Sequence, residues 1–345
     1  MFNKLKNKLD SELIKFIAYT NIRYGLSGIS PLLFDNMKQF ILREGKRIRP
    51  ILFIVGYKGF SQKNPKNLFR SALAIELLHD FLLVHDDIVD NSDLRRGKPS
   101  MHKLMEQKIK SKKAGFSGKD LAMITGDIMY AIAIEAFLAI NENPQRKEAA
   151  LRKFIATACY TGCGEFIELL YSLEDISKIK KDQIYKIYDY KTAYYTFTAP
   201  LITGAILAGA SKKQTDKLHK FGIALGRAFQ IKDDILGIFA QEAKTGKSSL
   251  SDLQEAKKTL LIWHAYTHAN TREKNQLKKI LGKTKITLKD LEISRKIIIN
   301  TKSLEYAKTQ IRILLGQAQT TMRDLNMRPV YKKALLDYTQ RILNI

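Results

Sequence analysis

The chain has 345 residues, enough for two domains, and 45% of them are hydrophobic, as in ordinary globular proteins. Its net charge of +25 suits anionic partners such as a diphosphate, a nucleic acid or a membrane surface, but no nucleic-acid-binding signature accompanies that charge. Two cysteines, Cys159 and Cys163, exclude a disulfide framework and offer no zinc-ligand spacing, so we expect reduced thiols and a cytoplasmic protein.

Nearly every segment repeats its apolar residues with the period of a helix, and no convincing strand pattern is present. The sequence therefore predicts an all-α protein of about a dozen helices. It has no linker, low-complexity stretch or fixed-period repeat, so we expect a single domain over residues 1–345. Because no signal peptide or long apolar run is evident, we expect no stable membrane insertion.

Residues 1–17 form a basic amphipathic pattern, which fits either a helix packed on the protein or one that touches a membrane, and we favour packing. Further along, Gly45 is a flexible point and Pro50 suits the first turn of a helix. Lys46 and Arg49 lie three apart on one face of this helix start, which suits an anion, although taken alone the segment is better explained as surface charge.

The stretch 76–98 is an apolar helix that ends in acids and runs into two arginines. Asp86 and Asp90 are four apart and share one face, with Asp87 beside them. Carboxylates this close repel each other, and together with substrate phosphates they are typical Mg²⁺ ligands. Arg95 and Arg96 suit phosphate oxygens, so the stretch predicts a magnesium diphosphate site.

The middle of the chain adds a lysine and a second acidic helix end. Lys191 precedes Thr192 between tyrosines, where its ammonium group either reaches the surface or enters a cavity. Residues 218–239 resemble the first stretch, because this helical segment also ends in acids, Asp233 and Asp234. Its glycines, four apart, allow close helix contact. Two facing carboxylate clusters across a cavity would bind several Mg²⁺ ions and a polyanion.

A loop with lysines follows, without the pattern of a P-loop, and helices from residue 272 to 345 carry no catalytic constellation, so we interpret them as scaffold. Taken together, the segments 45–50, 76–98, 191–192, 229–239 and 246–259 resemble the short-chain trans-isoprenyl diphosphate synthases of the polyprenyl synthetase family, closest to its archaeal-type branch. The resemblance covers about residues 40–265.

This resemblance implies a class I isoprenoid synthase fold, an all-α bundle around a central catalytic cavity, usually as a homodimer. It implies a prenyltransferase that condenses isopentenyl diphosphate with an allylic diphosphate (dimethylallyl, geranyl or farnesyl) in the presence of three Mg²⁺ ions. The implied metal ligands are Asp86, Asp87, Asp90, Asp233 and Asp234.

The resemblance also assigns the remaining roles. The groups implied to stabilise the leaving diphosphate are Arg95, Lys191, Lys247 and Lys257. Those implied to hold isopentenyl diphosphate are Gly45, Lys46, Arg49, His79 and Arg96. Thr192 and Gln230 match positions that line the path of the allylic cation, and the implied catalytic set is Asp86, Asp90, Lys191 and Asp233.

Several positions depart from the family pattern. Gly237 replaces the last aspartate of the second motif, so a third metal ion would rest on Asp233 with less support. Leu250 and Ala256 replace usual glycines beside the lysine loop. Glu165 and Glu168 stand where Gln and Asp are usual, which would change the hydrogen bonds around the metal ligands.

Product length in the family depends on what blocks the cavity below the first motif. Phe81 lies five residues before Asp86, about 7.5 Å along the helix, and Leu82 lies four residues before Asp86, on nearly the same face as that aspartate. A single aromatic residue at the Phe81 position implies geranylgeranyl diphosphate (C20), with farnesyl diphosphate as the alternative. Ordinary core packing is the other interpretation of Phe81.

Three other functions were weighed. A terpene cyclase would not need the cations assigned to isopentenyl diphosphate. A non-catalytic subunit of a heteromeric synthase typically lacks aspartates of the first motif, and this chain keeps all three. A basic nucleic-acid-binding protein would bind DNA in a salt-sensitive way and would not respond to Mg²⁺ and diphosphate.

Overall fold

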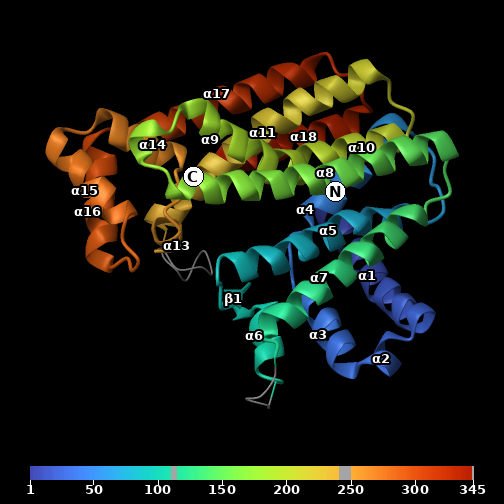
Figure 1. Ribbon diagram of the computed structural model, residues 1–345. Coiled ribbons are helices and arrows are strands. Elements are labelled where there is room, and N and C mark those ends of the chain that lie inside the picture. Colours follow the sequence, from blue (N-terminus) through green and yellow to red (C-terminus); the bar gives the residue numbers. More distant parts are fainter. Residues whose placement is uncertain (110–114, 241–249, 344–345) are drawn as a thin grey trace. The chain divides into compact units, whose positions relative to one another are not determined.

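The computed structural model describes residues 1–109, 115–240 and 250–343 (Figure 1). In this part of the chain every regular element is a helix except one two-stranded hairpin, which confirms the all-α prediction. The contacts group the chain into two compact units, one of residues 1–154 and 203–210, the other of residues 155–202 and 211–345. The single domain over 1–345 stays a prediction.

The first unit holds seven helices and the hairpin, up to the start of α8. Their bounds are α1 Phe2–Tyr24, α2 Leu26–Ile29, α3 Pro31–Ile41, α4 Ile48–Phe60, α5 Leu68–Val89, β1 Leu94–Arg95, β2 Lys98–Pro99, α6 Met101–Glu106 and α7 Gly118–Leu138.

The core of the first unit forms where α5 packs along α7 (Figure 1). Residues such as Leu73, Leu77 and Val84 of α5 are fully buried, so the apolar part of this helix is fixed while acids remain at its end. The amphipathic face of α1 is also buried, through Leu9 and Phe16, and it packs against α4 and α5. The packing interpretation of the first residues is therefore confirmed.

Among the described helices, α7 alone is long and apolar enough to cross a membrane by length and composition. Of its most apolar window, 44% is buried inside the protein. Core helices show the same composition, so this single helix is weak evidence for a membrane span.

The second unit holds the rest of the chain. The remaining elements are α8 Pro144–Leu173, a 3₁₀ turn at Ile176–Lys178, α9 Lys181–Ile187, a π-helix at Tyr188–Thr198, α10 Ala199–Leu207, α11 Lys212–Phe239, α13 Ser251–Gln254, α14 Leu260–His268, α15 Thr271–Leu281, α16 Leu288–Asn300, α17 Ser303–Arg323 and α18 Pro329–Leu343. The first residues of α8, up to Phe154, and α10 from Thr203 onward belong to the first unit.

Helix α11 is the centre of the second unit, because it packs along both α17 and the π-helix. The expected close contact at its glycines is present: a side chain at Gly222 would meet Thr198, and one at Gly226 would meet the backbone of Ala193. Only glycine permits helices to approach this closely, so these positions fix where α11 lies against the π-helix.

Candidate active site

The first acidic helix end is built by α5 and the hairpin that follows it. Helix α5 ends with Asp90 as its C-cap. The chain then reverses between β1 and β2 through Arg96 and Gly97, both with positive φ (54° and 71°). Two such residues define the turn that matches the twist of a tight hairpin, and glycine accepts this conformation without strain. Arg95 stands directly before this turn, and its side chain contacts α5.

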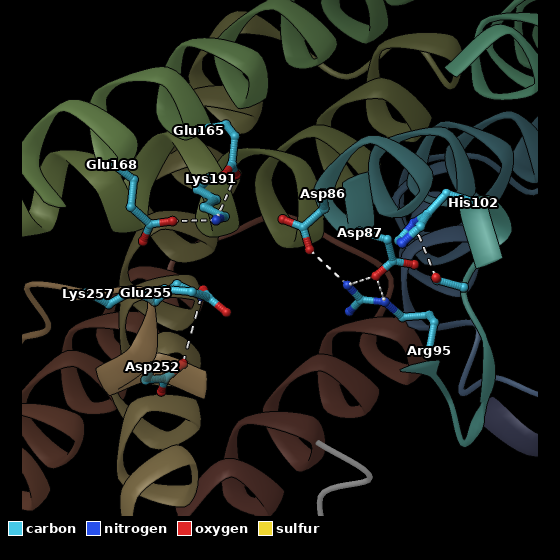
Figure 2. A network of polar contacts seen from close by, with 11 residues as sticks. Asp86, Asp87, Arg95, His102, Glu165, Glu168, Lys191, Asp252, Glu255 and Lys257 are labelled. Atoms are coloured by element: carbon cyan, nitrogen blue, oxygen red, sulfur yellow. Dashed lines mark hydrogen bonds and ion pairs between the residues drawn. The ribbon is translucent and has the colours of Figure 1, made fainter. Parts of the chain in front are cut away.

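Figure 2 shows the Arg95 guanidinium beside Asp86 and Asp87. Its Nη2 lies 3.0 Å from an oxygen of Asp86, and its Nε donates to Asp87 at 2.7 Å. Burial lowers the pKa of Arg95, but the hydrogen bond and charge of Asp87 outweigh it and raise that pKa. Arg95 and Asp87 are therefore both held as ions.

The three aspartates of the first motif differ in exposure. Asp87 is fully buried and bonded to Arg95, whereas Asp86 and Asp90 are partly exposed, one helical turn apart. Two carboxylates on one accessible face suit Mg²⁺. The assignment of Asp87 as a further metal ligand stays a prediction, and such a role would compete with its bond to Arg95.

The basic segment before α4 is held in the first unit by the side chain of Arg47. The side chain of Arg47 donates to Glu76 at 2.6 Å, to Asp10 at 2.9 Å and to the carbonyl oxygen of Arg43 at 2.9 Å. A side chain at Gly45 would be 3.3 Å from Nη1 of Arg96. Gly45 therefore lets this segment pass close to the hairpin.

The cations assigned to isopentenyl diphosphate differ in exposure. Lys46 is exposed, and Arg49 and Arg96 are partly exposed, so all three remain accessible to an anion. Sequence reasoning missed Arg47, the buried residue that fixes this segment. Arg47 has a left-handed backbone conformation (φ 50°), and no residue pattern in the sequence predicts this conformation.

Two titratable residues of α5 face these arginines. Burial, then the charges of Arg49 and Arg96, lowers the pKa of His79 well below its usual range, so His79 is neutral. Asp80, next to it, is fully buried and was not identified from the sequence. Burial raises the pKa of Asp80 well above its usual range.

In the second unit, the π-helix carries Lys191 at its centre. Its Nζ lies 2.7 Å from Glu165 and is also bonded to Glu168, as Figure 2 shows. π-Helices occur frequently at functional sites. Two carboxylates hold the ammonium group of Lys191, and the two interpretations of this residue, a side chain that reaches the surface or one that enters a cavity, both stay predictions.

Thr192 begins a chain of hydrogen bonds that ends at α14. Its hydroxyl donates to Gln230 at 2.6 Å, and Gln230 donates to Asp234 at 2.9 Å. The hydroxyl of Tyr188 donates to the other oxygen of Asp234 and accepts from the backbone N–H of Leu260 at 2.8 Å. The predicted residues Thr192, Gln230 and Asp234 thus form one network, while Tyr188 was missed.

The second acidic pair has one exposed and one buried member. Asp233 is exposed on α11, whereas Asp234 is buried. Burial raises the pKa of Asp234 well above its usual range, although the hydrogen bonds from Tyr188 and Gln230 act in the opposite direction. Asp233 is therefore the accessible carboxylate of this pair, and the assignment of both aspartates to a metal stays a prediction.

Other acids lie beside the second motif. A side chain at Gly237 would collide with the carboxylate of Asp252, so the missing aspartate leaves room for another acid. Lys257 lies 2.5 Å from Glu255 and 3.8 Å from Asp252 (Figure 2). Lys247, the other lysine assigned to the diphosphate, lies outside the described residues.

The predicted product floor lies in an aromatic row of the first unit. The ring of Phe81 is 4.6 Å from the ring of His85 and 5.1 Å from that of Tyr130 on α7. Tyr130 stacks on Phe154 at 6.4 Å. Leu82 is partly exposed. Sequence reasoning found Phe81 but missed Tyr130, which belongs to a helix distant in sequence.

The chain resembles known proteins over nearly its whole length. A family model described as polyprenyl synthetase matches residues 30–298. The chain belongs to the polyprenyl synthetase family.

A short chain isoprenyl diphosphate synthase of Methanocaldococcus jannaschii is 31% identical over 89% of this chain and 85% of its own length. A geranylgeranyl diphosphate synthase of Sulfolobus acidocaldarius is 32% identical, with 89% and 86% covered. Other relatives are named geranylfarnesyl diphosphate synthases.

A solved geranylgeranyl pyrophosphate synthase of Corynebacterium glutamicum, complexed with isoprenyl diphosphate and magnesium, superposes with a TM-score of 0.91 at 23% identity. The superposition covers 100% of this chain and 99% of the solved chain. The predicted class I isoprenoid synthase fold is therefore confirmed, and the chain is a prenyltransferase of the short-chain trans-prenyl diphosphate synthases that uses isoprenyl diphosphate substrates.

Proposed function

We propose that this polyprenyl synthetase condenses isopentenyl diphosphate with an allylic diphosphate in a Mg²⁺-dependent, head-to-tail reaction, and that its main product is geranylgeranyl diphosphate. The observation that carries the proposal is the α5 end, where Asp86 and Asp90 face outward one turn apart beside an arginine held by Asp87. Accessible carboxylates with guanidinium groups near them are what a metal-bound diphosphate requires.

The donor chemistry of the exposed acids fits Mg²⁺. Asp86 and Asp90 in the first unit and Asp233 in the second offer hard carboxylate oxygens, and we assign the metal ions to these three residues. Bound Mg²⁺ would supply positive charge for the oxygens of a leaving diphosphate. We expect three ions per active site, a number that the resemblance suggests.

The resemblance also assigns cations of the chain to the leaving diphosphate. Arg95, Lys191 and Lys257 carry positive charges that suit the charge developing as the allylic C–O bond breaks. Asp87, Glu168 and Glu255 hold these three cations, respectively. We infer that these acids position the cations for a diphosphate. Lys247 is assigned to the diphosphate from the resemblance alone.

The second substrate would bind through Gly45, Lys46, Arg49, His79 and Arg96. Arg49 and Arg96 supply guanidinium groups for its diphosphate, and the neutral imidazole of His79 offers a hydrogen bond without a further charge. The double bond of isopentenyl diphosphate attacks the allylic cation, and the released diphosphate then takes a proton from the carbon next to the new cationic centre, which forms the new double bond. Thr192 and Gln230 are assigned to the path of the cation.

The product length is proposed from the aromatic row of the first unit. Phe81 stands against Tyr130, so two rings rather than one single side chain would limit the cavity. This supports geranylgeranyl diphosphate over a longer product, while the missing second aromatic residue at Leu82 argues against farnesyl diphosphate.

The reaction is tested with purified protein, Mg²⁺, labelled isopentenyl diphosphate and, in separate tubes, C5, C10 and C15 allylic diphosphates, followed by sizing of the dephosphorylated products. A C20 product is expected. A C15 or C25 product would support the proposed reaction but show that the chain length is limited elsewhere than at Phe81. If isopentenyl diphosphate is not incorporated with any starter, the chain is not a standalone synthase, and a non-catalytic subunit is favoured.

The floor has its own test in Phe81→Ala, which we expect to lengthen the product. Phe69→Ala, on the same helix but beside Lys8 of α1, is the matched control and should leave the product length unchanged. Unchanged length in Phe81→Ala would place the floor elsewhere.

We propose a homodimer with a cytoplasmic location. Helix α8 exposes a stripe of apolar side chains, including Phe166 (64% exposed) and Leu173 (84%), beside the two exposed cysteines. Stripes of this kind mark protein interfaces. Light scattering should give twice the chain mass, and Phe166→Glu should shift the protein towards monomer.

A further inference from the structure

One face of α5 carries three buried acids, and the middle one differs from the others. Glu76, Asp80 and Asp87 follow each other at helical spacing, with exposed fractions of 2%, 0% and 0%. Glu76 accepts a hydrogen bond from Arg47 at 2.6 Å, and Asp87 accepts one from Arg95 at 2.7 Å. Neither oxygen of Asp80 has a hydrogen-bond partner in the part of the chain that the structure describes.

Charged groups from three other segments, together with Glu76 of its own helix, face Asp80. Glu76 faces it from its own helix, Arg47 and Arg49 from the start of α4, Arg43 from the segment before α4, and Arg96 from the hairpin. Burial raises the pKa of Asp80, Glu76 adds to this, and Arg96, Arg47 and Arg49 oppose it. Asp80 therefore keeps its proton at pH values where an exposed aspartate is ionised.

The position of Asp80 matters because two of these arginines belong to the subsite assigned to isopentenyl diphosphate. Arg96 lies against Gly45, and Arg49 stands at the start of α4. A neutral acid leaves the charge of both guanidinium groups available to an anion. An ionised carboxylate in the same place offsets that charge, so less of it acts on a bound anion.

Packing alone does not require an acid here. A buried carboxyl group with no hydrogen bond costs free energy, whereas an apolar side chain of similar size would fill the same space at no such cost. The same helix pairs its two other buried acids with arginines. The unpaired acid is thus a specific feature of this position.

We propose that Asp80 controls how tightly the adjoining arginines bind the diphosphate of isopentenyl diphosphate: protonated, it leaves their charge to the ligand, and ionised, it competes with the ligand. The inference rests on the proposed function and adds a residue that sets substrate affinity to the same subsite. Asp80 is a positioning residue, since it acts through Arg49 and Arg96.

The test measures binding of isopentenyl diphosphate by calorimetry, without an allylic substrate so that no turnover occurs, between pH 6 and pH 9. Wild type is compared with Asp80→Asn, which is neutral at every pH and has nearly the same shape. Asp10→Asn is the control, because Asp10 also bonds Arg47 but is partly exposed.

We expect the ratio of the wild-type Kd to the Asp80→Asn Kd to rise with pH, from about one to about tenfold, since one unit of pKa difference corresponds to a factor of ten. Because both proteins bind the same ligand, the ratio of the two Kd values cancels the effect of pH on the charge of isopentenyl diphosphate itself. The Asp10→Asn ratio should stay constant. In two buffers of different ionisation enthalpy, wild type should take up more protons on binding than Asp80→Asn at high pH.

A constant ratio together with equal proton uptake would overturn the inference while leaving the proposed function intact. Failure of folded wild type to bind isopentenyl diphosphate at any pH would overturn the proposed function and, with it, this inference. If Asp80→Asn does not fold, Asp80→Thr replaces it. If neither variant folds, absence of net proton uptake by wild type at pH 9 contradicts the inference.

Discussion

The two Asp-Asp pairs of this protein end similar helices, but each buries its second aspartate in a different way. Asp87 is bonded to the Arg95 guanidinium, which holds it as an ion. Asp234 accepts hydrogen bonds from Tyr188 and Gln230, neutral donors, and burial raises its pKa. The same dipeptide therefore supports a charged pair in the first unit and a hydrogen-bonded acid in the second.

The difference comes from what each helix packs against. After α5 the chain turns at once into the hairpin that carries Arg95. Helix α11 instead lies against the π-helix, which brings the Tyr188 hydroxyl to Asp234. In both pairs the first aspartate stays accessible, while the second is held by different partners.

Removing the charge of Asp87 is expected to have the largest effect. Asp87→Asn removes the buried counter-charge of Arg95 and leaves its guanidinium with the partly exposed Asp86, which we expect to cost up to about 3 kcal/mol of folding free energy. Asp234→Asn should cost about 1 kcal/mol, because an amide can still hydrogen-bond with Tyr188 and Gln230. Urea unfolding of both variants measures the contrast.

Asp233→Asn is the control for this comparison, since an exposed side chain is expected to change stability by less than about 0.5 kcal/mol. Equal losses in Asp87→Asn and Asp234→Asn would contradict the view that the two pairs are held differently.

The helices and their acidic ends follow from sequence because periodic apolar residues and aspartate spacing are local. The polyprenyl synthetase motifs likewise name Asp86, Asp90, Arg95, Lys191 and Asp233 from a single sequence. What holds Asp87 and Asp234 is not local, however. Arg95 reaches Asp87 across a loop in which Asn91 adopts a positive φ, and Tyr188 reaches Asp234 from 46 positions away.

The π-helix and the unpaired Asp80 also escape sequence reasoning. The π-helix carries no residue pattern of its own; it is recognised in the backbone next to Gly222 and Gly226. Asp80 looks like any polar residue on a helix until its neighbours are known. Its missing hydrogen bonds depend on where the arginines of other segments lie.

Tyr188→Phe sharpens the second half of the comparison. Loss of the hydroxyl removes a donor to Asp234 and an acceptor for the Leu260 N–H, so we expect a loss of about 1–3 kcal/mol. Tyr190→Phe, on the same π-helix and partly exposed, should change stability much less. A Tyr188→Phe protein as stable as wild type in thermal melting would show that Asp234 does not need this partner.

Gly237 is the point at which the two motifs differ in sequence, since α5 has Asp90 at the matching place. Gly237→Ala should raise stability by up to about 1 kcal/mol, because alanine favours helix and the colliding group is the end of the Asp252 side chain, which can turn away. Gly226→Ala is the matched opposite, since its Cβ would meet the backbone of Ala193. Destabilisation of both variants to the same extent, measured by melting temperature, would show that Asp252 is fixed in place.

The smallest effect is expected where the turns near the two motifs differ. The hairpin after α5 places Gly97 at φ 71°, whereas Ala256, before Lys257, adopts φ 51° with a side chain. An alanine in the left-handed region is strained by about 1 kcal/mol, and glycine removes this strain but adds freedom to the unfolded chain. Ala256→Gly should therefore gain no more than about 0.5 kcal/mol in urea unfolding. Ala240→Gly is the control, because Ala240 has an extended backbone with φ −78° and no strain to relieve. Glycine there only adds freedom to the unfolded chain, so this variant should be destabilised. An equal loss of stability in both variants would show that Ala256 is not strained.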